Sequence, residues 1–448
     1  MNTRITGDTF RKEASDKGRD NHELPEDIQG REAQRAFRPV PKPPLVVVPG
    51  ARTREGWALA ASRAQQQAPG LLWLTLAGLL IVFRVIAFLP DEVNSFAAGH
   101  YLFSYTDGFH KRALPGALLD AVFGYVSGKA IYALSLGMLA AFTVVLVAFM
   151  RRGLLASKEA LLLGLVLLAA PAILPHFAYS IGYFDPILVI CALLTVAVLD
   201  SSLPGGLQLL LACLPCAIGI LTHESFLLAA FPLVLARAFL QGKPARFPLW
   251  FLTGLVAVAT VTVQLFGHPS IPLDQYVTQA ATRTDQAPDP EAFRLLYFNL
   301  RDNYAYLVQH YSSVLTDARL IAALIVPIPY FVMLQDLFRL AARATGATPA
   351  RVWLAGVMVL APLALILVGF DALRWVSFAC LNCSLLVFEC ARAEGAEARE
   401  ALTLYLYSPR FWILALLSFA LGPLHVVDGN GVATGIHSIA HGLGLVRW

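Results

Sequence analysis

Residues 206–240 read GLQLLLACLPCAIGILTHESFLLAAFPLVLARAFL, a run of thirty-five residues without a polar loop. As one helix this run would extend about 50 Å at 1.5 Å per residue, which exceeds the ~30 Å hydrocarbon core of a bilayer. It must therefore turn, and residues 222–225 (THES) are the only polar place to do so. Because two short spans without a loop cannot extend far beyond the surface, we expect His223 and Glu224 to be recessed. The alternative is a tight turn whose polar groups satisfy helix ends.

The composition of the whole chain agrees with insertion into a membrane. Hydrophobic residues make up 57% and charged residues 14% of the 448 residues, and the mean hydropathy is +0.63. Soluble chains carry about 25% charged residues. Apolar runs of about twenty residues predict helices that satisfy their own backbone in lipid, so we expect an all-α polytopic membrane protein with about eleven spans. The expected spans are residues 71–89, 130–150, 159–178, 186–199, 206–221, 225–240, 247–266, 318–338, 352–369, 375–390 and 410–424.

Residues 1–70 differ from the rest of the chain. They mix charged residues, Gln and Pro, a composition that cannot bury a core, and we predict a mostly disordered cytoplasmic tail there. The transmembrane domain is expected over residues 71–448. Within it, residues 90–129 and 267–317 are too long and too polar for simple connections and are predicted to be outer loops. The first is expected to form interfacial helices with their apolar faces toward lipid.

Basic residues cluster in four of the loops between the expected spans. Cytoplasmic loops are enriched in Lys and Arg, so these clusters indicate the orientation of the chain. An even number of expected spans separates each cluster from the next, and all four therefore share one side with the N-terminal tail. We predict a cytoplasmic N-terminus and an external C-terminus. The basic residues are Arg151, Arg152, Lys158, Lys243, Arg246, Arg339, Arg343, Arg351, Arg392, Arg399 and Arg410.

The same orientation places the polar groups near membrane depth on the outer side. Ionisable residues at that depth are costly and usually line a site or a pathway, so we predict one outward-facing polar cavity. Ordinary alternatives exist for single residues. Asp185 before Pro186 is a common helix start, and Asp371 and Arg374 are spaced to pair on one helix. The convergent residues are Asp91, Glu92, Tyr183, Asp185, His223, Glu224, Asp371 and Arg374.

Common cofactor motifs are absent from the sequence. It contains no Walker loop, dinucleotide fingerprint or G-x-S-x-G element, so nucleotide-driven transport and serine hydrolysis lack support. The pairs Cys213-x-x-Cys216 and Cys380-x-x-Cys383 fall in apolar expected spans, where Cys is an ordinary small buried residue. We assign no metal site to them and expect no nucleic-acid partner.

Two short motifs resemble those of a known family. Residues 90–94 (PDEVN) place an acidic pair soon after the first expected span, as in the GT-C superfamily of integral-membrane glycosyltransferases. Residues 107–119 (DGFHKRALPGALL) are similar to the G-F-x-x-R-G-L-x-G segment of membrane proteins from bacterial surface-polysaccharide clusters, with Ala113 where Gly is common. The resemblance covers roughly residues 71–425 in architecture. It implies a GT-C-like fold and an inverting transfer of sugar from a polyprenyl-phosphate-type carrier.

The residues of the predicted cavity suit this chemistry. An acceptor hydroxyl is a weak nucleophile, so a carboxylate base is useful, and we assign that catalytic role to Asp91 with Glu92 as the competitor. Cations stabilise the anionic lipid phosphate that leaves. His223 and Glu224 are candidates to line the acceptor or to hold a divalent cation (Mg²⁺ or Mn²⁺), on which the resemblance does not decide. The candidates for binding substrate or lipid phosphate are Arg84, Lys111, Arg112, Asp185, His223, Glu224, Asp371 and Arg374.

Other classes of function stay open on the sequence alone. A transporter or flippase for a lipid-linked or anionic solute would also have titratable groups in a cavity, although transport favours sites near the bilayer midplane and this chain shows no repeated halves. A polysaccharide polymerase would use the same outer face, and a non-catalytic assembly subunit is a further alternative. The expected partners are a lipid-linked sugar donor, a glycan or lipid acceptor and membrane lipids. The expected location is a bacterial inner membrane.

Overall fold

The computed structural model describes residues 78–421 with gaps, the longer of which are residues 155–157, 242–246, 315–324 and 368–370. All of these residues belong to one unit, Trp57–Trp448. The expected tail (1–70), most of the first expected span and the chain beyond residue 421 lie outside the described residues.

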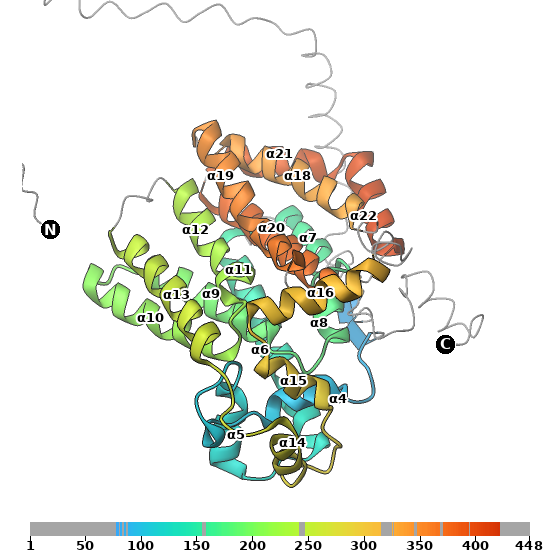
Figure 1. The fold of residues 1–448 in the computed structure, drawn as a ribbon. Helices are drawn as coiled ribbons and strands as arrows, with labels where there is room; N and C mark the ends of the chain where they lie inside the picture. Colours follow the sequence, from blue (N-terminus) through green and yellow to red (C-terminus); the bar gives the residue numbers. More distant parts are fainter. Residues whose placement is uncertain are drawn as a thin grey trace, which may run out of the picture. The chain divides into compact units, whose positions relative to one another are not determined.

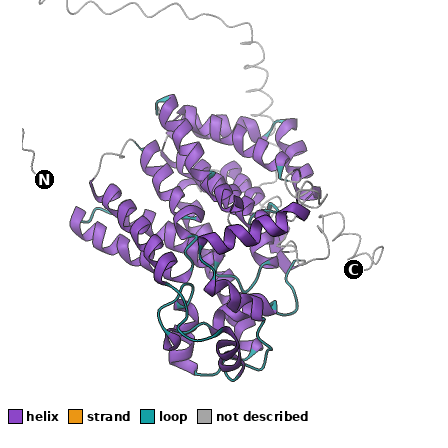
Figure 2. Ribbon diagram, in the orientation of Figure 1, coloured by secondary structure: helices purple, strands orange, loops and turns teal. Residues whose placement is uncertain are grey.

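The described residues form helices and no strands (Figure 2), as expected for an all-α protein. Five helices are long and apolar enough to cross a membrane, or up to seven if two bent helix pairs each count as one span. The expected count of about eleven is not confirmed. Hydropathy counted short apolar helices as full spans: α9 (Asp185–Leu199) has 15 residues and extends only about 22 Å. The long segments are Gly128–Met150, Leu162–Tyr179, Gly205–Thr222, Pro248–Phe266 and Ala372–Glu389, and the bent pairs are Pro349–Val359 with Ala361–Leu367 and Glu400–Leu406 with Pro409–Ala420.

Helix α20 (Ala372–Ala393) is the centre of the bundle. Its apolar segment is almost entirely buried, and α6 (Gly128–Leu154), α12 (Phe231–Leu240) and α18 (Ile328–Ala344) pack against it (Figure 1). The other helices of the bundle are α7 (Lys158–Ala169), α8 (Leu174–Tyr179), α10 (Gly205–Thr222), α11 (Phe226–Ala229), α13 (Phe247–Phe266), α19 (Pro349–Val359), α21 (Gly395–Leu406) and α22 (Pro409–Leu421). Helices α10 and α13 expose large apolar side chains such as Leu210 and Val258, which fits a surface in contact with lipid.

The two predicted outer segments pack against each other and form a cap, which we define as residues 90–127 and 267–299. The rings of Phe103 and Tyr276 both meet the ring of Phe293 edge to face, at centroid distances of 5.2 Å. A salt bridge of 3.0 Å between Arg283 and Asp120 joins the two segments a second time. The helical elements of the cap are α4 (Ser95–Gly99), η1 (His100–Leu102), η2 (Tyr105–Asp107), α5 (Leu114–Phe123), α14 (Leu273–Ala281) and α15 (Pro290–Tyr297), which lie together at one end of the bundle (Figure 1).

The long apolar run turns at the polar stretch that the sequence predicted. Helix α10 ends at Thr222, His223 is extended, and α11 begins at Phe226. The turn is tight because the Phe226 ring lies against Gly219, where a Cβ would stand 2.7 Å from the ring. His223 and Glu224 are largely buried in this turn, so the turn is recessed rather than exposed.

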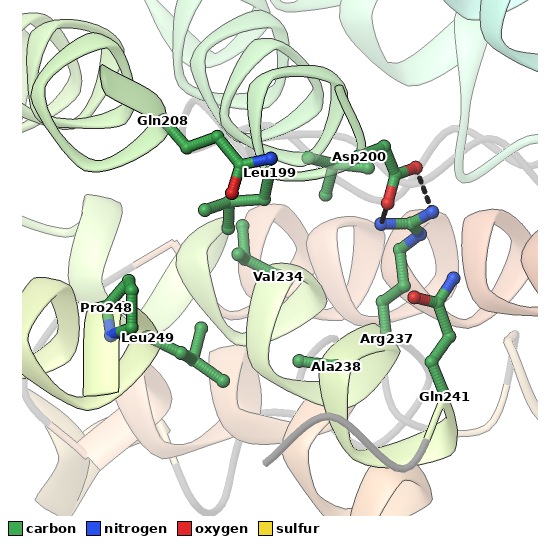
Figure 3. A pocket seen from close by; sticks show the side chains of 10 residues that line it. Leu199, Asp200, Gln208, Val234, Arg237, Ala238, Gln241, Pro248 and Leu249 are labelled. Carbon is green, nitrogen blue, oxygen red and sulfur yellow. Dashed lines mark hydrogen bonds and ion pairs between the residues drawn. The ribbon is translucent and has the colours of Figure 1, made fainter. Parts of the chain in front are cut away.

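A buried ion-pair network joins α9, α12 and α20 near their C-terminal ends. The guanidinium of Arg237 donates to both carboxylate oxygens of Asp200, just after α9, and also to the carboxylate of Glu389 on α20. A pocket of about 50 Å³ lies beside Asp200 and Arg237 and is otherwise lined mainly by apolar side chains and by Gln208 and Gln241 (Figure 3). Breaking one member of such a network leaves uncompensated charge in a low-dielectric interior.

We expect the substitution Arg237→Gln to destabilise the protein by about 3–5 kcal/mol, because the buried Glu389 and the partly buried Asp200 would lose their shared cation. Thermal unfolding of the detergent-solubilised protein measures this effect. The matched control is Arg410→Gln, which removes an exposed pairing with Asp336. Equal unfolding temperatures for the two variants would show that the Arg237 network does not stabilise the bundle.

Candidate functional site

Arg112 of the cap pairs with Glu224 of the α10–α11 turn. The Arg112 Nε lies 3.0 and 3.1 Å from the two carboxylate oxygens, and Nη2 lies 2.5 Å from Oε1. Both side chains are largely buried. Burial alone would raise the pKa of Glu224, but the charge and hydrogen bonds of Arg112 hold that pKa well below its usual value. Glu224 therefore stays ionised at neutral pH and fixes the position of the guanidinium.

The backbone around Arg112 explains the glycine positions of the 107–119 segment. Gly108 has a φ of +102°, and Arg112 has a φ of +63°, the only positive φ of a non-glycine residue among those described. Such a conformation costs a bulky residue about 1–3 kcal/mol. At Gly116 there is no room for a side chain, because a Cβ would stand 2.2 Å from the carbonyl oxygen of Phe103. The bidentate pairing with Glu224 holds Arg112 in its strained conformation.

A second buried pairing lies at the start of α9 and α20. Arg374 Nε donates to Asp185 at 2.6 Å, its Nη2 donates to the other oxygen of the same carboxylate, and its Nη1 lies 3.3 Å from Asp371. The guanidinium also lies 5.0 Å from the centroid of the Tyr183 ring. The pairing of Asp371 with Arg374 expected from their spacing is present. The stronger partner is Asp185, which is also the first residue of α9, so its role as helix start and its role as counter-ion coexist.

Two buried histidines lie within electrostatic reach of both pairings. Burial, and then the charges of Arg112 and Arg374, lower the pKa of His100 to about 3, and burial with the charge of Arg112 lowers the pKa of His223 well below its usual value. Both rings are therefore neutral at pH 7. The same two guanidinium groups act on both rings, so the pairings lie within electrostatic reach of each other. The backbone N–H of Ser225 donates to His223 Nδ1 at 3.1 Å, which leaves the ring proton on Nε2.

Lys111 completes this group. Its side chain is only 1% exposed, and its Nζ donates to the carbonyl oxygen of Phe298 at 2.6 Å. Burial lowers the pKa of Lys111 to about 8, although the Glu224 carboxylate partly offsets that effect. We call the whole group the charge cluster; it consists of His100, Lys111, Arg112, Asp185, His223, Glu224, Asp371 and Arg374.

Asp91 and Glu92 lie in an exposed bend that precedes α4. The next residue, Val93, packs against Gly182, where a Cβ would stand 2.4 Å from Val93 Cγ1. Tyr183 follows Gly182 and carries the ring beneath Arg374. The bend is therefore linked to the charge cluster through the packing of Val93 against Gly182, the neighbour of Tyr183. The Asp91 and Glu92 carboxylates themselves are not buried in the charge cluster.

Other expectations from the sequence have different outcomes. Arg84 lies outside the described residues. In the described part of the chain, no group of three or more His, Cys, Asp or Glu side chains is arranged to hold a metal ion. His100 was not among the candidates from the sequence, because nothing in its spacing indicates that an apolar 3₁₀ turn would bury it within electrostatic reach of Arg112 and Arg374. His110 and Tyr276, whose side chains meet at 3.0 Å, form a further polar contact inside the cap that the sequence did not indicate.

Comparisons with known proteins add no relative. No family model, no curated protein and no solved structure matches the chain.

The lowered pKa of Lys111 predicts a specific dependence of stability on pH. The unfolded chain binds more protons than the folded chain between the folded pKa of about 8 and the ordinary lysine pKa of 10.5, so stability rises with pH in that window. Between pH 8 and pH 9.5 the expected gain is about 2 kcal/mol. Lys111→Met should lose this gain, and Lys129→Met, at an exposed position, should keep it. A free energy of unfolding that rises equally with pH in both variants would contradict the lowered pKa of Lys111.

Proposed function

We propose that the chain is a membrane glycosyltransferase that takes a sugar from a polyprenyl-phosphate-type carrier and transfers it to a glycan or lipid acceptor. The observation that carries the proposal is the charge cluster. In it, Arg112 of the cap pairs with Glu224 of the bundle, the charge of Arg112 acts on Lys111, and Arg112 and Arg374 both act on His100. The proposed substrate is a lipid whose chain stays in the bilayer. Buried cations where the cap meets lipid-facing helices suit the binding of its phosphate. The GT-C-like arrangement and its inverting chemistry belong to this proposal.

Each charged group then has a distinct role. Arg112 and Lys111 bind the lipid phosphate and stabilise the charge that it gains when the sugar leaves. Arg374 adds to the positive potential, and Asp185 and Asp371 fix its position. Glu224 orients Arg112 and does not take the acceptor proton, because its pKa is held too low for a base at neutral pH.

The acceptor side of the reaction needs a base that water and a hydroxyl can reach. Asp91 in the exposed bend is our first candidate, and Glu92 is the competitor. An acceptor hydroxyl approaching from the aqueous side would lose its proton to this carboxylate as it attacks the anomeric carbon. His223, with its proton on Nε2, would donate a hydrogen bond to the acceptor or to the phosphate. The proposal places the cap on the outer face of a bacterial inner membrane and the N-terminus in the cytoplasm.

The direct test is sugar transfer in proteoliposomes, with a panel of radiolabelled polyprenyl-phosphate sugars and extracted membrane lipids or glycans as acceptors. Asp91→Asn should lower the rate by about 10²–10⁴, the usual contribution of a general base. Arg112→Gln should lower it by about 10²–10³, as expected for a group that stabilises transition-state charge. Arg410→Gln, which alters an exposed pairing outside the charge cluster, should retain the wild-type rate.

Three outcomes would count against the proposal. Full activity of both Asp91→Asn and Glu92→Gln would remove the carboxylate base. Full activity of Arg112→Gln would remove the phosphate role of the charge cluster. Uptake of a labelled lipid-linked or anionic solute into the vesicles without a new glycosidic product would favour a transporter.

A further inference from the structure

Helix α16 (Leu300–Val314) has a sharply defined start. The side-chain oxygen of Asn299 accepts from the backbone N–H groups of Arg301 and Asp302, and the Asp302 carboxylate accepts from the N–H of Asn299. Such reciprocal capping stabilises the first turn of a helix. Among the described elements, α16 nevertheless shares no extensive packing surface with another helix, and it crosses the front of the bundle in Figure 1.

Three large apolar side chains of α16 form an exposed stripe. Leu300, Tyr304 and Val308 follow the spacing i, i+4, i+8 on one side of the helix and are 55%, 59% and 51% exposed. The side chains that are partly buried against the protein include the polar Asp302 and Asn303. An amphipathic helix of a water-soluble protein has the opposite arrangement, because its apolar stripe faces the core.

We propose that α16 lies in the membrane interface, with the stripe of Leu300, Tyr304 and Val308 among the acyl chains of the bilayer. An apolar stripe with a tyrosine, flanked by the exposed polar residues Arg301 and Gln309, matches the composition of interfacial helices. The exposed face of α14 in the cap is polar instead: it carries Asp274, Gln275, Thr278 and Gln279. The exposed face of α14 thus lacks such a stripe, whereas α5 in the cap exposes Leu118, Val122 and Phe123.

A second copy of the chain fits this stripe poorly. A specific protein interface takes roughly 20–30 residues on each side, and the stripe offers only three large apolar side chains. The other exposed residues in the described part of the helix are Arg301, Ala305 and Gln309. Lipid acyl chains need no such area, because they cover any apolar surface at the right depth.

Helix α16 begins close to the charge cluster. Lys111 Nζ donates to the carbonyl oxygen of Phe298, two residues before the helix begins, and the rings of Phe298 and Tyr306 lie 5.6 Å apart. With its stripe in lipid, α16 forms the lateral border between the bilayer and Lys111, and Asp302, Asn303 and Tyr306 are turned toward the protein. This inference depends on membrane insertion of the chain and not on the proposed transfer reaction.

Photo-crosslinking tests the inference without disturbing the core. The photoreactive residue p-benzoylphenylalanine replaces, one at a time, Tyr304, Val308, Gln309 and Gln279, all of which are exposed. Gln309 is the matched control on the same helix, because it lies about 100° around the axis from Val308. The protein is irradiated in vesicles of phosphatidylethanolamine and phosphatidylglycerol, and intact-protein mass spectrometry measures the fraction that carries a phospholipid adduct.

We expect several-fold more phospholipid adduct at positions 304 and 308 than at 309, and the background level at 279. Equal adduct at positions 304, 308 and 309 would overturn the proposal, because the stripe would then have no preferred contact with lipid. Covalent dimers at positions 304 and 308 in place of lipid adducts would also overturn it and would assign the stripe to a second copy of the chain. Background adduct at all four positions would place α16 in water.

Discussion

The bidentate pairing of Arg112 with Glu224 is the interaction on which the site depends. It joins the cap to the α10–α11 turn, and it does so with two charges that are largely out of water. A buried charge is tolerated only when a partner of good geometry compensates it. Three local features accompany this contact: the turn at residues 222–225, the positive φ of Arg112 and the close packing at Gly116. The second pairing, Asp185 with Arg374, lies within electrostatic reach of the first.

Within the described helices, the Arg237 network and the charge cluster both hold buried charge, and their chemistry differs. Arg237 is compensated by two carboxylates, Asp200 and Glu389, and joins three helices near their C-terminal ends. The charge cluster instead contains Lys111 with a pKa lowered to about 8 and two histidines that burial keeps neutral. Groups with perturbed pKa values cluster at functional sites. For this reason the proposed function rests on the charge cluster, and Arg237 is interpreted as structural.

The sequence predicted those features that depend on local chemistry. The all-helical class followed from hydropathy, and the turn at His223 and Glu224 followed from the length of the apolar run. The spacing of Asp371 and Arg374 predicted their pairing. The number of spans was not confirmed, because hydropathy does not distinguish a short buried helix such as α9 from one that crosses the bilayer.

The sequence did not predict the ion pairs between residues far apart in the chain. Nothing in the spacing relates Arg112 to Glu224, which are 112 residues apart, or Arg374 to Asp185, which are 189 residues apart. Only the fold brings these partners together. It also buries His100 within electrostatic reach of Arg112 and Arg374. Asp91 and Glu92 lie in an exposed bend, so their assignment as the base stays a prediction.

The most direct measurement of the central claim is a cryo-electron microscopy structure of the protein in lipid nanodiscs with a polyprenyl phosphate added. The account predicts phosphate density within hydrogen-bond distance of the Arg112 guanidinium, with Lys111 or Arg374 as a second cation and the polyprenyl chain extending into the bilayer. Phosphate density beside Arg237, or a bound lipid that leaves the charge cluster empty while its phosphate is held elsewhere, would contradict it.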